Sequence, residues 1–286
     1  MYFVVAGEWH AEIRARSAPE AEVKREFVEI GRALDAADAH DRMIAIHPMT
    51  PHGSVREFNE AAWMDFADYQ QNYQDLHARA LESRRVPKPV VNSEYGYFLR
   101  DQNGDGVPDK DNSTSLQAMR HATWDLLMAG SYVVTGFGTT YFGGHRDPGP
   151  FDVTAPRNRA CEAQLAIAKR HFEGLEWWRL EPRDELVRSA VPRGRDGREI
   201  ERVTPPRVAY WGLAEPGQQY VVYVRGLSDP VPVALQDGTR LRARQLDPRT
   251  GLATELPAPR SDREYTYHPP DQQDWVVTLT RVPVSR

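Results

Sequence analysis

Two glutamates in this sequence stand directly after apolar segments that have the length of buried strands. Glu8 follows the apolar residues 2–6 and Gly7, and Glu94 follows residues 89–93. A carboxylate beside a buried strand gives up hydration, so this placement costs more free energy than a position on an exposed helix. In a barrel of parallel strands, residues at the carboxyl ends of the strands face the active site. Two carboxyl groups there suit cleavage of a glycosidic bond, which needs a proton donor and a nucleophile or base.

The side chains near the two glutamates fit a sugar-binding pocket. Aromatic faces stack on sugar rings, and polar side chains hydrogen-bond to carboxylates and hydroxyls. The ends of the predicted strands offer six candidates for substrate contact: Trp9, His10, His47, Gln70, Tyr95 and Tyr141. Simpler alternatives exist, because an aromatic residue at these positions can pack in the core. Either glutamate can also cap a helix or pair with an arginine.

Residues 101–109 resemble a calcium-binding loop of the EF-hand or dockerin type. Oxygen ligands recur at loop positions 1, 3, 5 and 9, a backbone carbonyl is available at position 7, and Gly106 occupies position 6. The candidate ligands are Asp101, Asn103, Asp105, the carbonyl of Val107, and Asp109. Asn112 replaces the usual bidentate glutamate, and Asp/Asn/Gly-rich turns also occur as plain solvated loops. Any calcium here is predicted to be structural, and no cofactor is predicted for catalysis.

The elements that must position these residues alternate along the first part of the chain. Short apolar segments predict strands at residues 2–6, 43–46, 65–70, 89–92 and 131–135. Amphipathic segments predict helices at residues 20–39, 75–83, 115–129 and 157–175. Alternation of strands and helices predicts a parallel sheet with crossover helices.

The pattern changes after residue 177 to that of an all-β domain. Prolines, glycines and arginines are dense between residues 182 and 206. Alternating apolar and polar residues then predict strands at 208–211, 220–224, 231–235, 241–246, 264–267 and 275–279, separated by turn signals. The sequence therefore predicts an α/β domain over residues 1–181, a linker over 182–204 and a β-sandwich over 205–286.

Composition restricts the partners of the chain. A net charge of −5 over 286 residues argues against a nucleic-acid binder that relies on a general basic field. No run of about 18 apolar residues is present, so no membrane-spanning helix is predicted. The single cysteine, Cys161, excludes an intrachain disulfide and is expected to be buried in a helix. The expected partner is a carbohydrate, and neither nucleic acid nor membrane is expected.

Several short motifs give the chain a resemblance to a known family. Residues 4–8, the histidine at the next strand end, residues 65–70 and residues 89–94 look like the apiosidase-like glycoside hydrolases. The segments 120–130 and 133–138 resemble the seventh helix and eighth strand of that family. The tail resembles the β-sandwich that often follows these barrels and is sometimes called a collagen-binding domain. The family usually has a tryptophan where this chain has Leu246.

This resemblance implies a fold and a role for each glutamate. The fold would be α/β, with strands four to eight of a (β/α)8 TIM barrel followed by the sandwich. Glu8 would end strand four and act as the acid/base, and Glu94 would end strand seven and act as the nucleophile of a retaining enzyme. Retention needs carboxyl groups about 5 to 5.5 Å apart. Like many family members, the chain departs from the Asn-Glu dipeptide at strand four, because Gly7 precedes Glu8.

In this assignment, strands one to three of the barrel would have to precede residue 2. We therefore expect either a truncated and inactive product, or self-association of two chains through the open barrel edge. Two other classes of function remain open at this point. One is a non-catalytic carbohydrate-binding or surface-adhesion protein, and the other is a structural domain stabilised by calcium.

Overall fold

The computed structural model describes residues 3–49, 58, 60–70, 75–98, 114–135, 156–187, 208–236 and 240–283. The first part contains β1 (Phe3–Val4), α1 (His10–Arg16), α2 (Glu20–Ala37), β2 (Ile44–Ala45), β3 (Ala67–Gln70), α4 (Leu76–Ser83), β4 (Val90–Tyr95), α5 (Leu116–Met128), β5 (Tyr132–Thr135) and α6 (Pro156–Glu173). The second part contains the 3-10 helices η2 (Trp177–Arg179) and η3 (Asp184–Leu186). Its strands are β6 (Glu181–Pro182), β7 (Ala209–Glu215), β8 (Gln219–Arg225), β9 (Val231–Ala234), β10 (Leu241–Leu246), β11 (Ala253–Leu256), β12 (Glu264–Tyr267) and β13 (Trp275–Arg281).

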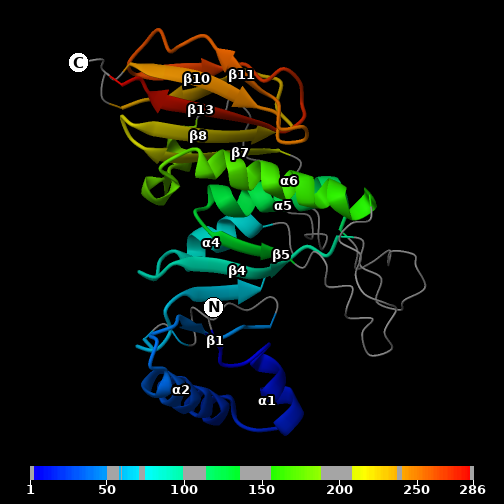
Figure 1. Ribbon diagram of the computed structural model, residues 1–286, viewed down its shortest axis with the longest axis vertical. Helices are drawn as coiled ribbons and strands as arrows, with labels where there is room; N and C mark the ends of the chain where they lie inside the picture. Colours follow the sequence, from blue (N-terminus) through cyan, green and yellow to red (C-terminus); the bar gives the residue numbers. More distant parts are fainter. Residues whose placement is uncertain are drawn as a thin grey trace.

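The strands of the first part lie side by side in chain order (Figure 1). β1 pairs with β2 in parallel, and β4 pairs in parallel with both β3 and β5. The backbone amide of Asp65 donates to the carbonyl of Ile44 (2.9 Å), which links β2 to the segment that enters β3. This parallel arrangement with helices between the strands is the one that the sequence predicts, and it fits part of a (β/α)8 barrel. It brings the carboxyl ends of the strands to one edge.

Side chains along β3 alternate between the apolar core and the opposite face of the sheet. Ala67 and Tyr69 pack in the apolar cluster that α4 and α5 form over the sheet. Asp68 and Gln70 therefore point to the opposite face of the strand. A second cluster, which includes Val23 and Phe27 of α2, covers β2. None of the helices among the described residues is long and apolar enough to cross a membrane.

The second part of the chain is an antiparallel β-sandwich, as predicted. Six strands form one sheet in the order β11-β10-β13-β8-β7-β6, and β12 and β9 form the other. Apolar side chains of both sheets, among them Val222, Leu279 and Val233, share one buried core.

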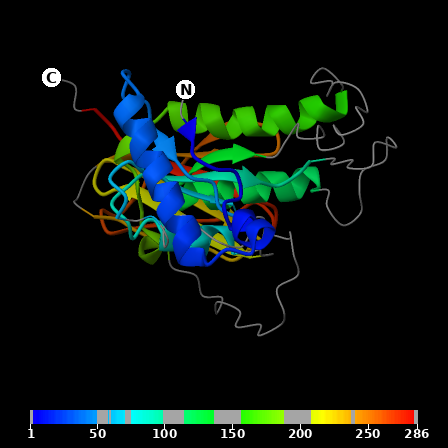
Figure 2. The same ribbon diagram turned by 90° about the horizontal axis from the view of Figure 1, so that it is seen from below.

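Helices α5 and α6 lie between the parallel strands and the sandwich, and both run roughly along the strand direction (Figures 1 and 2). Two buried ion pairs cross from α5 to the sandwich. Arg225 of β8 donates to Asp125 (2.8 Å), and Arg120 donates to both oxygens of Asp274 (2.6 and 2.9 Å). The sandwich therefore braces α5, whose other side packs against β4.

Three elements differ from the sequence-based expectation. The pattern did not predict α1, because its seven residues contain little apolar periodicity. It also did not predict β11, whose side chains do not alternate between buried and exposed. Strand β6 falls at the start of the predicted linker, yet Glu181 pairs with Ala214 and Pro182 with Leu213 of β7. The six-stranded sheet thus includes residues on the N-terminal side of the predicted boundary at 205.

Candidate active site

The turn between β1 and α1 carries the first candidate carboxylate. Parallel pairing continues beyond β1 and β2, since the amide of His47 donates to the carbonyl of Ala6 (3.0 Å) and the amide of Trp9 donates to the carbonyl of His47 (3.2 Å). These two bonds place Glu8 in the turn beside His47. Glu8 is exposed and has a left-handed backbone conformation with a φ of 47°.

A bulge in β4 brings two consecutive side chains to the ring of His47. Ser93 is an extra residue in the pairing with β3, because the register passes from Asn92 directly to Glu94. The pairing with β5 shifts at the same place. Regular alternation would send Ser93 and Glu94 to opposite faces, and the bulge removes that constraint. His47 Nδ1 lies 2.8 Å from Ser93 Oγ, and His47 Nε2 lies 3.1 Å from Glu94 Oε2.

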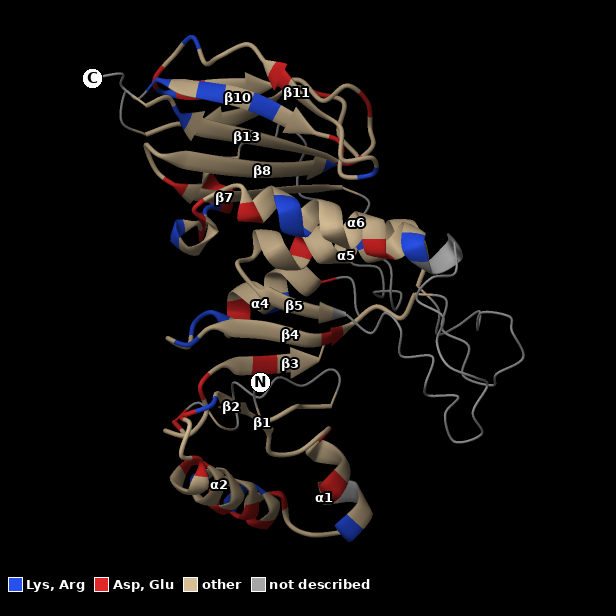
Figure 3. Cartoon of the chain, viewed as in Figure 1, with Lys and Arg blue, Asp and Glu red and all other residues tan. Residues whose placement is uncertain are grey.

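Strand β3 connects the two candidate carboxylates. Gln70 Nε2 donates to Glu8 Oε1 (3.3 Å), and the backbone of Gln70 is in register with Glu94. Asp68, on the same face, has Oδ2 at 3.4 Å from His47 Nδ1. The structure thus brings Glu8, His47, Gln70 and Glu94 together at one edge of the sheet. Figure 3 shows the acidic residues on β3 and at the carboxyl end of β4.

Two carboxylates beside His47 favour its protonated form. Burial by itself lowers the pKa of His47, but hydrogen bonds and charge attraction from Asp68 and Glu94 outweigh burial and raise this pKa from 6.5 to about 9. Both ring nitrogens of the imidazolium can then donate, Nε2 to Glu94 and Nδ1 to the Ser93 and Asp68 oxygens. Sequence reasoning missed Asp68 and Ser93, although Asp68 stands two residues before Gln70 and therefore shares its face.

This raised pKa predicts a pH-dependent contribution of His47 to stability. A pKa of 6.5 in the unfolded chain and about 9 in the folded chain gives a contribution that is complete below pH 6.5 and is lost as the pH rises through 9. We expect the free energy of unfolding to fall on the order of 1–3 kcal/mol between about pH 6 and pH 10 from this residue. Urea unfolding of the wild type and of His47→Gln measures the difference. Equal pH dependence in the two proteins would contradict this role.

The backbone conformation of Glu8 predicts a gain in stability on replacement by glycine. A non-glycine residue in the left-handed region costs about 1–2 kcal/mol, whereas glycine adopts this region freely. Glu8→Gly should stabilise the fold by about 0.5–1 kcal/mol in urea unfolding, after the larger entropy of unfolded glycine is subtracted. Ser17→Gly is the matched control, because Ser17 has a φ of 51° at the end of α1. It should stabilise the fold by a similar amount. A less stable Glu8→Gly protein would refute the strain.

Two aromatic residues predicted to contact substrate are core residues instead. Trp9 has no exposed surface and packs edge-on against Phe58, with ring centroids 5.1 Å apart. Tyr95 also has no exposed surface, and its hydroxyl lies 2.8 Å from Thr123 Oγ1 on α5. A fully buried ring has no face for a sugar, so the predicted contacts of Trp9 and Tyr95 do not agree with the structure.

The remaining predicted residues have other outcomes. His10 begins α1, and its Nδ1 accepts a hydrogen bond from the amide of Met49 (3.2 Å), which fastens the loop after β2. Its contact with substrate stays a prediction. Tyr141 and the calcium-loop residues 101–109 lie outside the described residues. Within the described part of the chain, no group of three or more His, Cys, Asp or Glu side chains is placed to hold a metal ion.

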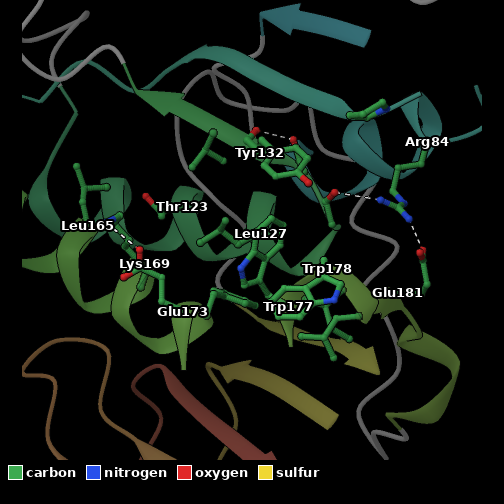
Figure 4. Close-up of a pocket in the computed structure, with 18 of the residues that line it drawn as sticks. Arg84, Thr123, Leu127, Tyr132, Leu165, Lys169, Glu173, Trp177, Trp178 and Glu181 are labelled. Atoms are coloured by element: carbon green, nitrogen blue, oxygen red, sulfur yellow. Dashed lines mark hydrogen bonds and ion pairs between the residues drawn. The ribbon is translucent and has the colours of Figure 1, made fainter. Parts of the chain in front are cut away.

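A cavity of about 1,030 Å³ lies away from the candidate carboxylates, between β5 and α6 (Figure 4). Its lining includes the exposed aromatic residues Tyr132, Trp177 and Trp178, but neither Glu8 nor Glu94. The rim carries ion pairs between Arg84 and Glu181 and between Lys169 and Glu173. Cavity size therefore does not mark the site of chemistry here. The candidate active site is identified instead by the side-chain contacts at the strand ends.

The fold of the chain is similar to that of solved glycoside hydrolases. One solved structure, described as a glycoside hydrolase, has a TM-score of 0.68 and 16% identity, with 91% of this chain and 62% of the other covered. A glycoside hydrolase of family 5 from Bacteroides vulgatus ATCC 8482 has a TM-score of 0.67 and 16% identity, with 92% and 59% covered. The chain thus spans about three fifths of the length of these structures.

Residues 1–151 match the sequence pattern of a family described as apiosidase-like, catalytic domain. No curated protein matches the chain. The matched residues are more than half of the 286 residues and include the turn after β1, the ends of β3 and β4, and the strand β5. This chain therefore belongs to the apiosidase-like catalytic domain family.

Proposed function

We propose that this chain carries the catalytic carboxylates of a retaining O-glycosyl hydrolase that acts on a polysaccharide or oligosaccharide. Membership of the family and a fold shared with glycoside hydrolases support this class of reaction. The observation that carries the proposal is the position of Gln70, which donates to Glu8 and is in register with Glu94. Glu8 thus contacts the side chain of Gln70 while Glu94 lies beside the backbone of the same residue, which supports a shared site for the two carboxyl groups at this edge of the sheet.

In the proposed reaction the two glutamates divide the work of a double displacement. An oxygen of Glu94 attacks the anomeric carbon while Glu8 gives its proton to the departing glycosidic oxygen, so that the glycosidic bond breaks and a glycosyl ester forms. Glu8 then takes a proton from water, the water oxygen attacks the anomeric carbon, and Glu94 leaves as a carboxylate. The exposure of Glu8 suits this role, because its carboxyl group must exchange protons with water.

The stereochemistry of the product tests this mechanism. The chain is incubated with a panel of plant and microbial polysaccharides, and proton NMR records the anomeric configuration of the first product before mutarotation. Net retention supports a covalent intermediate on Glu94. Net inversion would mean that water attacks the anomeric carbon directly, with one glutamate as base and the other as acid. The proposal does not allow this single step.

We also propose that residues 101–109 bind a structural calcium ion, since their spacing is that of a calcium loop. Binding to the folded state alone stabilises a protein by mass action. We therefore expect a chelator to lower the melting temperature by several degrees and added calcium to restore it. Asp105→Ala should abolish the response to calcium. An identical melting temperature with chelator and with calcium would contradict the site.

A further inference from the structure

We propose that Asp68 and Ser93 hold the ring of His47 against Glu94 Oε2, which makes His47 a positioning residue that orients the nucleophile. This inference rests on the proposed function of Glu94. The three residues that act on Glu94, which are Asp68, Ser93 and His47, take no part in the proposed double displacement. It also predicts which oxygen of Glu94 attacks, because an Oε2 that accepts from His47 leaves Oε1 as the attacking atom.

The bulge in β4 is the structural basis of this arrangement. A regular strand would direct only one of the two residues, Ser93 or Glu94, to the face that carries His47. The extra residue lets both reach the same imidazole, one at each nitrogen, at 2.8 and 3.1 Å. Bulges next to active sites commonly redirect a side chain in this way. The bulge therefore fixes the ring plane of His47 relative to the carboxyl group of Glu94.

Two carboxylates face the ring of His47 and favour a proton on each of its nitrogens. Asp68 faces it from β3 and Glu94 from β4, and the acid of the turn after β1, Glu8, contacts Gln70 instead. No Lys or Arg side chain of the described residues forms a hydrogen bond or ion pair with His47. A neutral imidazole can keep its one proton on Nε2 for Glu94 and accept from the Ser93 hydroxyl at Nδ1, but it then turns a lone pair toward Asp68 Oδ2. Loss of the second proton should therefore remove the contact with Asp68 and the charge attraction to Glu94.

Strand β3 supplies both halves of the site from one face. Asp68 is 1% exposed and contacts His47, while Gln70 is 4% exposed and contacts Glu8. The spacing of two residues along the strand thus sets the distance between the His47–Glu94 pair and Glu8. A change at Asp68 should act on Glu94 through His47 and leave the Gln70–Glu8 contact in place.

The experiment combines an NMR titration with a pH profile of hydrolysis. The His47 imidazole signal is assigned by its absence in His47→Gln and is titrated in the wild type, Asp68→Asn, Ser93→Ala and Asp75→Asn. Asp75→Asn is the matched control, since Asp75 pairs with Arg79 on α4. We expect a wild-type midpoint near pH 9, a fall of at least about one pH unit in Asp68→Asn, a smaller fall in Ser93→Ala, and no change in the control.

Loss of the Glu8 proton also lowers kcat/KM at alkaline pH. The comparison between variants is therefore the readout: a step of kcat/KM that follows the NMR midpoint should move in Asp68→Asn and stay in place in Asp75→Asn, whereas a merely structural role of Asp68 would move no such step. A wild-type midpoint near 6.5, or an unchanged midpoint in Asp68→Asn, would overturn the proposal. The NMR midpoints can be measured whether or not the protein hydrolyses a glycan. If the midpoints shift as expected but the wild type cleaves none of the glycans, the proposed function fails while the contact between His47 and Glu94 stands.

Discussion

Glu94→Gln is expected to lower kcat/KM for glycan hydrolysis by at least about 10⁴-fold, because an amide cannot form the glycosyl ester on which both steps depend. The side chain keeps its size and can still accept a hydrogen bond from His47 Nε2 through its amide oxygen. We therefore expect the fold to persist with a modest fall in melting temperature, because one of the two charges that face His47 is lost. Release of reducing sugar from the best glycan of the panel measures the effect.

The same variant separates the enzyme from a non-catalytic glycan-binding protein. Binding of the glycan, measured by calorimetry, should persist in Glu94→Gln while hydrolysis disappears. Glu12→Gln, on the exposed side of α1, is the control and should keep wild-type activity. Hydrolysis by Glu94→Gln within tenfold of the wild type would exclude Glu94 as the nucleophile.

Arg225→Met is expected to destabilise the fold by about 3–5 kcal/mol, because it leaves the carboxylate of Asp125 buried without its cation. Arg225 and Asp125 are 2% and 1% exposed, and the guanidinium donates to Asp125 at 2.8 Å. Trp211 Nε1 also donates to Asp125 (2.8 Å), but a neutral donor cannot replace the charge. Urea unfolding of the variant and of the wild type measures the loss.

Two further variants show whether burial causes this loss. Arg244→Met removes an exposed ion pair with Glu255 (3.9 Å) on the outer strands of the same sheet and should cost less than about 1 kcal/mol. The double variant Asp125→Asn with Arg225→Met should recover part of the stability, because no unpaired charge remains. Equal losses in Arg225→Met and Arg244→Met would show that the sandwich does not brace α5 through this contact.

Local patterns predicted most of the fold. Residues 241–246 and 264–267 alternate between apolar and polar side chains, and they form β10 and β12 with the predicted bounds. The amphipathic segment 20–39 forms α2 over Glu20–Ala37. The contact of Arg225 with Asp125 joins residues 100 positions apart, and no local pattern contains information on such a pair. The bracing of α5 by the sandwich therefore came only from the structure.

The candidate site was predicted in part, for a physical reason that lies in strand geometry. The rule that residues at the carboxyl ends of parallel strands share one edge correctly grouped Glu8, His47, Gln70 and Glu94. Alternation explains why Tyr95 is buried and not in the predicted contact with substrate, because a residue next to Glu94 on a strand points away from it. Trp9 packs inward because the turn after Glu8 leads directly into α1. The bulge at Ser93 depends on pairing with two neighbouring strands, so the sequence of β4 alone does not reveal it.

The most direct test of the proposed double displacement is to trap the covalent intermediate and find the residue that holds it. Activated 2-deoxy-2-fluoro glycosides of several sugars, each with a dinitrophenolate leaving group, slow the second step more than the first and let the glycosyl ester accumulate. Mass spectrometry of peptides then locates the added sugar. We expect a label on Glu94 that is absent in Glu94→Gln and retained in Glu8→Ala. A label on Glu8, or hydrolysis with retention and a label on neither glutamate, would contradict the proposed mechanism.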